Sequence, residues 1–154
     1  MQFDLRRLDG PRGQFSLSAG YDNATAEMAL SLSLEEEAGG IAATLLGLPG
    51  LPSVDLSLQG QGPVDDVTIT AALATDGVDR LTGSIVSGRL EDGTQRLTLD
   101  LGGDLAALVL PDYRDFFGSE VGLSAVAQRF PNGAITLDRF DLHTAALRHK
   151  GDVA

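Results

Sequence analysis

The sequence predicts a mostly β fold in which short strands build one long antiparallel sheet, with two short helices between them. Apolar and polar residues alternate along most of the chain, and this period of two is typical of strands with one apolar face. Glycine, proline and aspartate–glycine pairs separate these runs at short intervals, as they do in antiparallel hairpins. Two apolar stretches, within residues 38–48 and 104–118, have helical character and predict the helices.

Three strands are predicted before the first helix. The first covers residues 3–9 and ends at Gly10-Pro11, and the second covers residues 14–21 and ends at the turn Tyr21-Asp22-Asn23. The third covers residues 26–34 and alternates cleanly, because every second residue is a large apolar one: Met28, Leu30, Leu32 and Leu34.

The first helix is predicted from Ile41 to Leu48, since Ile41, Leu45 and Leu48 recur at helical spacing and would share one face. Pro49-Gly50 ends it, because proline cannot donate the next backbone hydrogen bond and glycine tolerates unusual dihedral angles. Three glutamates, Glu35–Glu37, precede this helix. We interpret them as a solvated helix start that the helix dipole stabilises, in preference to an acid–base site.

The rest of the chain predicts seven more strands. The run SVDLSLQ forms the first of them, with Val54, Leu56 and Leu58 on one side. The others cover residues 67–75, 80–89, 94–101, 120–129, 134–144 and 148–154.

Two turns and the second helix connect these strands. Asp76-Gly77 and Asp92-Gly93 predict two-residue hairpin turns, in which both central residues take positive φ. The second helical stretch would begin at Asp104, which suits an N-cap, and would be interrupted by Pro111.

The order of these elements repeats. The runs LSLSL, from Leu30, and LTLDL, from Leu97, lie 67 positions apart, and each precedes a helix, a strand, a glycine-containing turn and a strand. The tripeptide FDL recurs at Phe3 and Phe140, 137 positions apart and close to twice that spacing. The pattern predicts a single segment made of two units, approximately residues 1–70 and 71–154, that continue one another's apolar surface.

The composition excludes several classes of function. The formal net charge is −11 over 154 residues, so the surface would repel nucleic acid and anionic membranes. The chain has no cysteine, which rules out disulfides and thiolate chemistry, and no apolar run long enough for a signal peptide or a spanning helix. Taken as a whole protein it would be cytoplasmic. Both ends read as interrupted strands, however, so we expect an excerpt from a longer protein.

No enzyme is expected, because no P-loop, nucleophile-elbow or dinucleotide-binding motif occurs. His143 and His149 are six positions apart without a cluster of further ligands, so they do not predict a zinc site. Asp65-Asp66, Asp112 and Asp115 lack the spacing of a calcium loop. We therefore predict neither a metal nor another cofactor.

The alternating strands predict an aliphatic stripe, which could either bind acyl chains or form the core of a closed β-sandwich. Removing an acyl chain of roughly fifteen carbons from water is worth on the order of 12 kcal/mol, and a continuous apolar stripe can supply that surface. Alternation by itself favours the β-sandwich core. The candidate lining residues are Met28, Leu30, Leu32, Val54, Leu56, Leu58, Val67, Ile69, Leu73, Leu97, Leu99, Leu101, Leu123, Ile135 and Leu137.

Two long segments carry a family resemblance. The first is GGIAATLLGLPGLPSVDLSLQGQGPVDD, followed by a strand and RLTGSI. The second is LDLGGDLAALVLPDYRDFFGSEVGL, followed by ITLDRFDLHTAALRHKGDV. Both resemble the repeating segments of the bacterial TamB family, which belongs to the AsmA-like, repeating-β-groove superfamily. The resemblance covers residues 3–154 and rests on structural residues.

The resemblance implies a curved sheet that forms an open apolar groove (a β-taco), in the periplasmic part of a parent protein anchored in the inner membrane. TamB-family members are implicated in phospholipid transport to the outer membrane and in outer-membrane protein assembly with a TamA-type barrel partner. The resemblance therefore favours a lipid conduit between the two membranes over a β-sandwich core. The expected partners are phospholipid acyl chains and, through the parent chain, a TamA- or BamA-type outer-membrane barrel, but no nucleic acid.

Two alternatives to the conduit stay open: a structural scaffold in outer-membrane protein assembly, and a closed β-sandwich binding module. In the conduit hypothesis the first helix caps a junction between repeats. Ile41, Leu45 and Leu48 would then point into the groove beside the strand residues.

Overall fold

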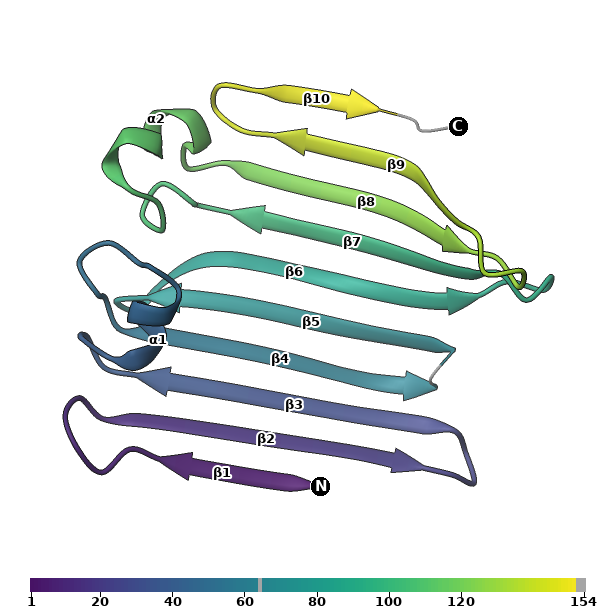
Figure 1. Cartoon of the computed structure of the whole chain (residues 1–154), viewed down its shortest axis with the longest axis horizontal. Helices are drawn as coiled ribbons and strands as arrows, with labels where there is room; N and C mark the ends of the chain where they lie inside the picture. The colour runs from purple at the N-terminus through teal and green to yellow at the C-terminus, as the bar shows by residue number, and fades with distance from the viewer. Residues whose placement is uncertain (64, 152–154) are drawn as a thin grey trace.

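The computed structural model describes residues 1–63 and 65–151, and these form one open antiparallel sheet (Figure 1). Ten strands lie side by side in the order in which they occur in the sequence, from β1 to β10. Neighbouring strands are antiparallel, so the sheet is a meander with its first and last strands at opposite edges. The prediction of a mostly β fold is confirmed, and the open sheet with two short helices fits a curved groove.

Each predicted strand is present, with ends that differ by a few residues from the prediction. The strands are β1 (Gln2–Arg6), β2 (Gly13–Asp22), β3 (Glu27–Glu36), β4 (Val54–Pro63), β5 (Asp66–Thr75), β6 (Val78–Arg89), β7 (Gln95–Gly103), β8 (Val121–Arg129), β9 (Ile135–His143) and β10 (Arg148–Gly151). The strand predicted over residues 148–154 is described as far as Gly151, and residues 152–154 lie outside the described residues.

The first helix is shorter than predicted. It is α1, which covers Ile41–Leu45 and does not reach Leu48. Gly47 takes a φ of 66°, in the left-handed region that ends helices, so the chain turns before Leu48. The expectation that Ile41, Leu45 and Leu48 share a helical face is therefore wrong.

The second helical segment begins at Pro111, and not at Asp104 as predicted. Pro111–Tyr113 form the 3-10 turn η1, and Arg114–Phe117 form α2. Leu110 is extended, with a ψ of 151°, because a residue before proline avoids the helical region, whereas proline itself fits the first position of a helix. Asp104 accepts a hydrogen bond from the Ala106 backbone N–H (3.0 Å), but it does so in a turn.

The two aspartate–glycine turns differ from each other. The β5–β6 turn is the predicted two-residue hairpin, with φ of 51° at Asp76 and 72° at Gly77. The β6–β7 connection is wider than predicted, because it spans residues 90–94 and only Gly93, at 83°, takes a positive φ there. The Asp92 carboxylate accepts the Thr94 backbone N–H (2.9 Å), and this hydrogen bond holds the pKa of Asp92 below its usual value.

A small core lies at one end of the sheet, where α1 folds over the strands. The buried cluster consists of Ala42, Ala43, Leu48 and Val54, with Leu34, Leu73 and Leu108 packed against it. Leu34 and Leu73 belong to β3 and β5, so α1 covers this end of one sheet face. The β7–β8 connection, which contains η1 and α2, lies at the same end of the sheet, at the left of Figure 1.

The positions of the helical connections show a period of four strands. They follow β3 and β7, and the similar runs that begin at Leu30 and Leu97 lie in these two strands. Phe3 in β1 and Phe140 in β9 are separated by two such periods. The sequence similarity therefore coincides with the order of the strands, while the boundaries of the two units, residues 1–70 and 71–154, stay a prediction.

Candidate functional site: an apolar face of the sheet

The strand register gathers the large apolar side chains on one side of the sheet. Directly paired residues of antiparallel strands point to the same side, so a line of partners can be followed across the sheet. Ile69 of β5 pairs with Ile85 of β6, and Ile85 pairs with Leu99 of β7. Leu99 pairs with Ala125 of β8, which pairs with Phe140 of β9. The line stays apolar over five strands.

We call the surface in register with this line the apolar face. From β1 to β5 it consists of Phe3, Leu5, Phe15, Leu17, Ala19, Met28, Leu30, Leu32, Leu34, Val54, Leu56, Leu58, Gly60, Val67, Ile69, Ala71 and Leu73. From β6 to β9 it consists of Leu81, Gly83, Ile85, Leu97, Leu99, Leu101, Leu123, Ala125, Ala127, Ile135, Leu137, Phe140 and Leu142. From β1 to β9, the polar residues on this side lie at or near strand ends. The charged ones are Glu36, Arg89, Arg129 and Arg80, which donates a hydrogen bond to Thr75 on this side, and the uncharged ones are Tyr21, Thr75, Ser87 and Gln95.

Every strand residue that alternation predicts as lining lies on the apolar face. Val54 and Val67 are buried, and most of the others are partly exposed. Leu97 and Ile135 are 44% and 73% exposed, because no second layer lies over them in the described part of the chain. The structure thus brings these side chains together on one largely uncovered surface.

Part of the apolar face was not predicted from the sequence. Phe3 and Leu5 in β1, and Leu81 and Ile85 in β6, occupy it without having been named as candidates. All four alternate with neighbouring residues, so the signal was present. Val86 obscures it in β6, because it is apolar and yet lies on the opposite face, paired with Thr68 and Thr98.

Ile41 and Leu45 are not packed against the strands as the predicted helix face would require. Their side chains are 55% and 81% exposed, whereas the small residues Ala42 and Ala43 are buried between α1 and the sheet. Leu48 is buried in the same cluster, but it reaches it from the turn that follows α1. The first helix therefore covers one end of the apolar face through its alanines.

The opposite face of the sheet is mainly polar, although Val86 and Val126 lie on it. Its central line of partners runs through Ser18, Ser31, Gln59, Thr70, Ser84, Asp100 and Ser124. Hydroxyl and amide groups can be fully hydrated there, whereas the aliphatic side chains of the apolar face cannot form hydrogen bonds with water. The sheet is therefore amphipathic, and burial of its apolar face is the change that lowers the free energy.

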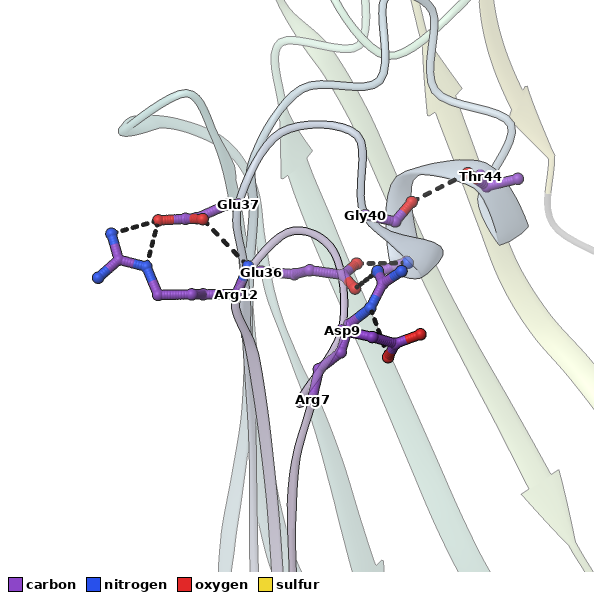
Figure 2. A network of polar contacts seen from close by, with 8 residues as sticks. Arg7, Asp9, Arg12, Glu36, Glu37, Gly40 and Thr44 are labelled. Atoms are coloured by element: carbon purple, nitrogen blue, oxygen red, sulfur yellow. Dashed lines mark hydrogen bonds and ion pairs between the residues drawn. The ribbon is translucent and has the colours of Figure 1, made fainter.

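A buried carboxylate fixes α1 at its end of the apolar face (Figure 2). Glu36, at the end of β3, is only 8% exposed and accepts the Ala42 backbone N–H at 2.6 Å. The Nη1 atom of Arg7 lies 3.5 Å from the other oxygen of this carboxylate. The interpretation of this glutamate as solvated is wrong, because β3 continues through Glu36 and turns its side chain toward α1, although the expected attraction to the helix start is present.

Glu37 behaves as the sequence predicts for a surface charge. It is exposed and accepts hydrogen bonds from the backbone N–H of Arg12 (3.0 Å) and from the Arg12 side-chain Nε (2.7 Å), as Figure 2 shows. The side-chain hydrogen bond from Arg12 is the main reason that the pKa of Glu37 lies below its usual value. This pair ties the β1–β2 loop to the end of β3.

A second carboxylate occupies the equivalent place before the β7–β8 connection. Asp104 accepts the Ala106 backbone N–H of that connection, and its other oxygen lies 3.0 Å from Nη1 of Arg80. In both places an acid at the end of the strand, Glu36 as the last residue of β3 and Asp104 directly after β7, binds a backbone N–H of the helical connection and an arginine near the preceding hairpin. This shared arrangement fits the four-strand period and holds both connections at the same end of the sheet.

The described residues hold no cluster typical of a metal site. Within residues 1–63 and 65–151, no three His, Cys, Asp or Glu side chains group together as a metal site would require. None of the helices in the same ranges has the length and hydropathy needed to cross a bilayer. The apolar face is the most extensive surface feature of the described residues.

Comparison with protein-family models, curated proteins and solved structures found no match to this chain. The apolar face is therefore the feature from which a function can be inferred.

Proposed function

We propose that this chain is a segment of a lipid conduit, in which the apolar face holds the acyl chains of phospholipid. The observation that carries the proposal is the continuity of that face, which crosses from β1 to β9 with charged residues only at or near the strand ends. Contact with aliphatic side chains is non-directional, so it can hold an acyl chain without fixing it in one position. That property suits a ligand that slides.

The dimensions and energetics support the same proposal. Ten strands about 4.8 Å apart give a sheet about 43 Å across, which is wide enough for several acyl chains to lie on it at once. Covering an acyl chain of about fifteen carbons is worth on the order of 12 kcal/mol, at about 0.8 kcal/mol per methylene group. Aliphatic side chains across successive strands provide the matching apolar surface.

The helix α1 and the charge distribution favour movement across the strands. At one end of the strands the face is covered by the cluster of Ala42, Ala43 and Leu48, so an acyl chain would not leave there. The net charge of −11 is carried by side chains outside the central apolar face, where it keeps the other surfaces hydrated. A lipid would therefore pass from strand to neighbouring strand.

We further propose that this segment lies in the periplasm, within a parent protein anchored in the inner membrane, and moves phospholipid between the two membranes. Support comes from the TamB-like segments of the sequence together with an apolar face that has to be shielded from water. The protein itself supplies the surface, and no cofactor or catalytic step is involved.

Ile85 and Val86 offer a matched test of this proposal. They are neighbours in β6, each is 37% exposed, and they point to opposite faces of the sheet. We expect Ile85→Asp to abolish the phospholipid that copurifies with the chain, since it places a charge in the acyl-chain path, and Val86→Asp to retain it. Lipid extraction and mass spectrometry measure both. Equal phospholipid in the two variants, or none with the unsubstituted chain, would contradict the proposal.

A scaffold in outer-membrane protein assembly is a second candidate, and the sheet edges favour it. All five residues of β1 are exposed, and β1 has a neighbour on one side only. Such an edge can add a strand from a partner through backbone hydrogen bonds. In that case Ile85→Asp would spare function as long as the sheet folds. The third alternative, a β-sandwich closed within one chain, is wrong for the described residues, which form a single open sheet.

A further inference from the structure

We infer that, without lipid, two copies of this chain pack with their apolar faces together as a symmetric dimer. The chain exposes 9903 Å² of accessible surface. A compact monomer of 16.1 kDa exposes about 7,400 Å², so the open sheet exposes about 2,500 Å² more. A single-layer fold of this composition thus lacks the cover that a second layer would supply.

The excess area is large enough for a stable homodimer. If only half of it is covered, each chain loses about 1,250 Å² and the pair buries about 2,500 Å² in total, within the range of permanent homodimers. Covering aliphatic surface is favourable, whereas covering the hydroxyls and amides of the polar face leaves their hydrogen bonds to be replaced. The apolar face is therefore the surface that a second copy would bury.

Charge repulsion excludes the polar face as the contact surface of the dimer. On the polar face Glu35 lies directly opposite Asp55, and both side chains are exposed. Two chains with a net charge of −11 each would repel each other if these faces met. Packing through the apolar faces keeps such charges on the outside of both layers, as in a β-sandwich with an aliphatic interior.

The helix α1 fixes how the two sheets lie. It covers the end of the apolar face formed by Leu34 and Leu73, where Leu108 of the β7–β8 connection also packs. If the two sheets packed with their α1 ends together, α1 of one copy would collide with the β7–β8 connection of the other copy. Reversing the ends removes that conflict. The two-fold axis then lies between the two sheets and perpendicular to the strands, so that β5 of one copy packs on β5 of the other, and β6 packs on β6. The pair Ile69 and Ile85 lies near that axis.

The absence of cysteine makes this dimer directly testable, because any introduced thiol is the only one in the chain. Lipid-free chain from cell-free synthesis should sediment at twice 16.1 kDa at micromolar concentration. On mild oxidation Ile85→Cys should form a disulfide-linked dimer at least about tenfold faster than Val86→Cys. The reason is that only the thiol at position 85 lies near the equivalent thiol of the second chain. Circular dichroism of both variants checks that the sheet is intact, and Ile69→Cys provides a second position on the same face.

A monomeric lipid-free chain would overturn the inference. Equal rates for Ile85→Cys and Val86→Cys within a dimer would also overturn it, since they would assign the contact to a sheet edge. The inference concerns the chain without lipid and does not rest on the proposed function. The phospholipid content of Ile85→Asp therefore tests the conduit independently of the dimer.

Discussion

One added methyl group at position 40 tests the buried carboxylate at the start of α1. Gly40 has a φ of −78° and a ψ of 176°, so its backbone does not require glycine. At such a position alanine ordinarily stabilises a protein by about 0.4–1 kcal/mol, because it restricts the unfolded chain. Here the Cβ of an alanine would overlap the carboxyl group of Glu36. The space at Gly40 is thus occupied by the side chain that holds α1.

The expected cost follows from what Glu36 must give up. To avoid the new methyl group its carboxylate has to leave the Ala42 backbone N–H, which it now binds at 2.6 Å in a buried setting. Losing a hydrogen bond to a charged group costs about 1.5–3 kcal/mol. After the gain from the restricted unfolded chain is subtracted, Gly40→Ala should lower the free energy of unfolding by about 0.5–2.5 kcal/mol.

Urea denaturation followed by circular dichroism measures this change. In a Glu36→Ala background the same substitution displaces no carboxylate, so it should be neutral or stabilising. Gly20→Ala is the matched control, because a Cβ there meets nothing within 4 Å and the substitution should not destabilise. An equal loss from Gly40→Ala with and without Glu36 would refute the reasoning.

Three further predictions concern the same end of the sheet and one turn. Leu48→Ala should lower the free energy of unfolding by about 2–4 kcal/mol, whereas Leu45→Ala, at an 81% exposed position, should change it by less than about 0.5 kcal/mol in urea denaturation. Arg7→Gln should cost about 1–3 kcal/mol because it leaves a buried carboxylate without its ion pair. Arg12→Gln should cost much less by the same assay, because the Arg12 side chain is 89% exposed and water screens its pair with Glu37. The lowered pKa of Asp92 means that its carboxylate stabilises the fold above the ordinary aspartate pKa, and that this contribution is lost as the pH falls through the lowered value. Asp92→Ala should therefore destabilise at neutral pH and less in acid, which urea denaturation across pH measures. Equal effects within either pair of variants, or an Asp92→Ala penalty that persists unchanged in acid, would contradict these assignments.

The strands could be predicted because their signal is local. In β3 the alternation of Leu30 and Leu32 with serines is visible in the sequence and survives in the sheet, where one side of the strand is apolar and the other polar. Assigning every strand to the same face needed the register as well. In β6, where Val86 obscures the alternation, the partners of Leu81 and Ile85 in β5 and β7 place these two residues on the apolar face.

The helical connections were harder to predict because distant residues decide them. The three consecutive glutamates read as a charged surface, yet Glu36 is buried by contacts with Arg7, 29 positions earlier, and with α1. Helical spacing pointed to Ile41 and Leu45, whereas the residues of α1 that are buried over the strands are Ala42 and Ala43. Which of these side chains are buried depends on how closely α1 approaches the sheet, and no local sequence pattern encodes that distance.

The most direct test of the lipid-conduit proposal is site-specific photocrosslinking in cells that make this chain. A photoreactive amino acid is placed at Leu56 or Ile69 on the apolar face, or at Asp55, which adjoins Leu56 in β4 and points to the polar face. The proposal predicts phospholipid adducts, identified by mass spectrometry, at Leu56 and Ile69 and none at Asp55. Adducts at Asp55 without adducts at Leu56 and Ile69 would contradict it.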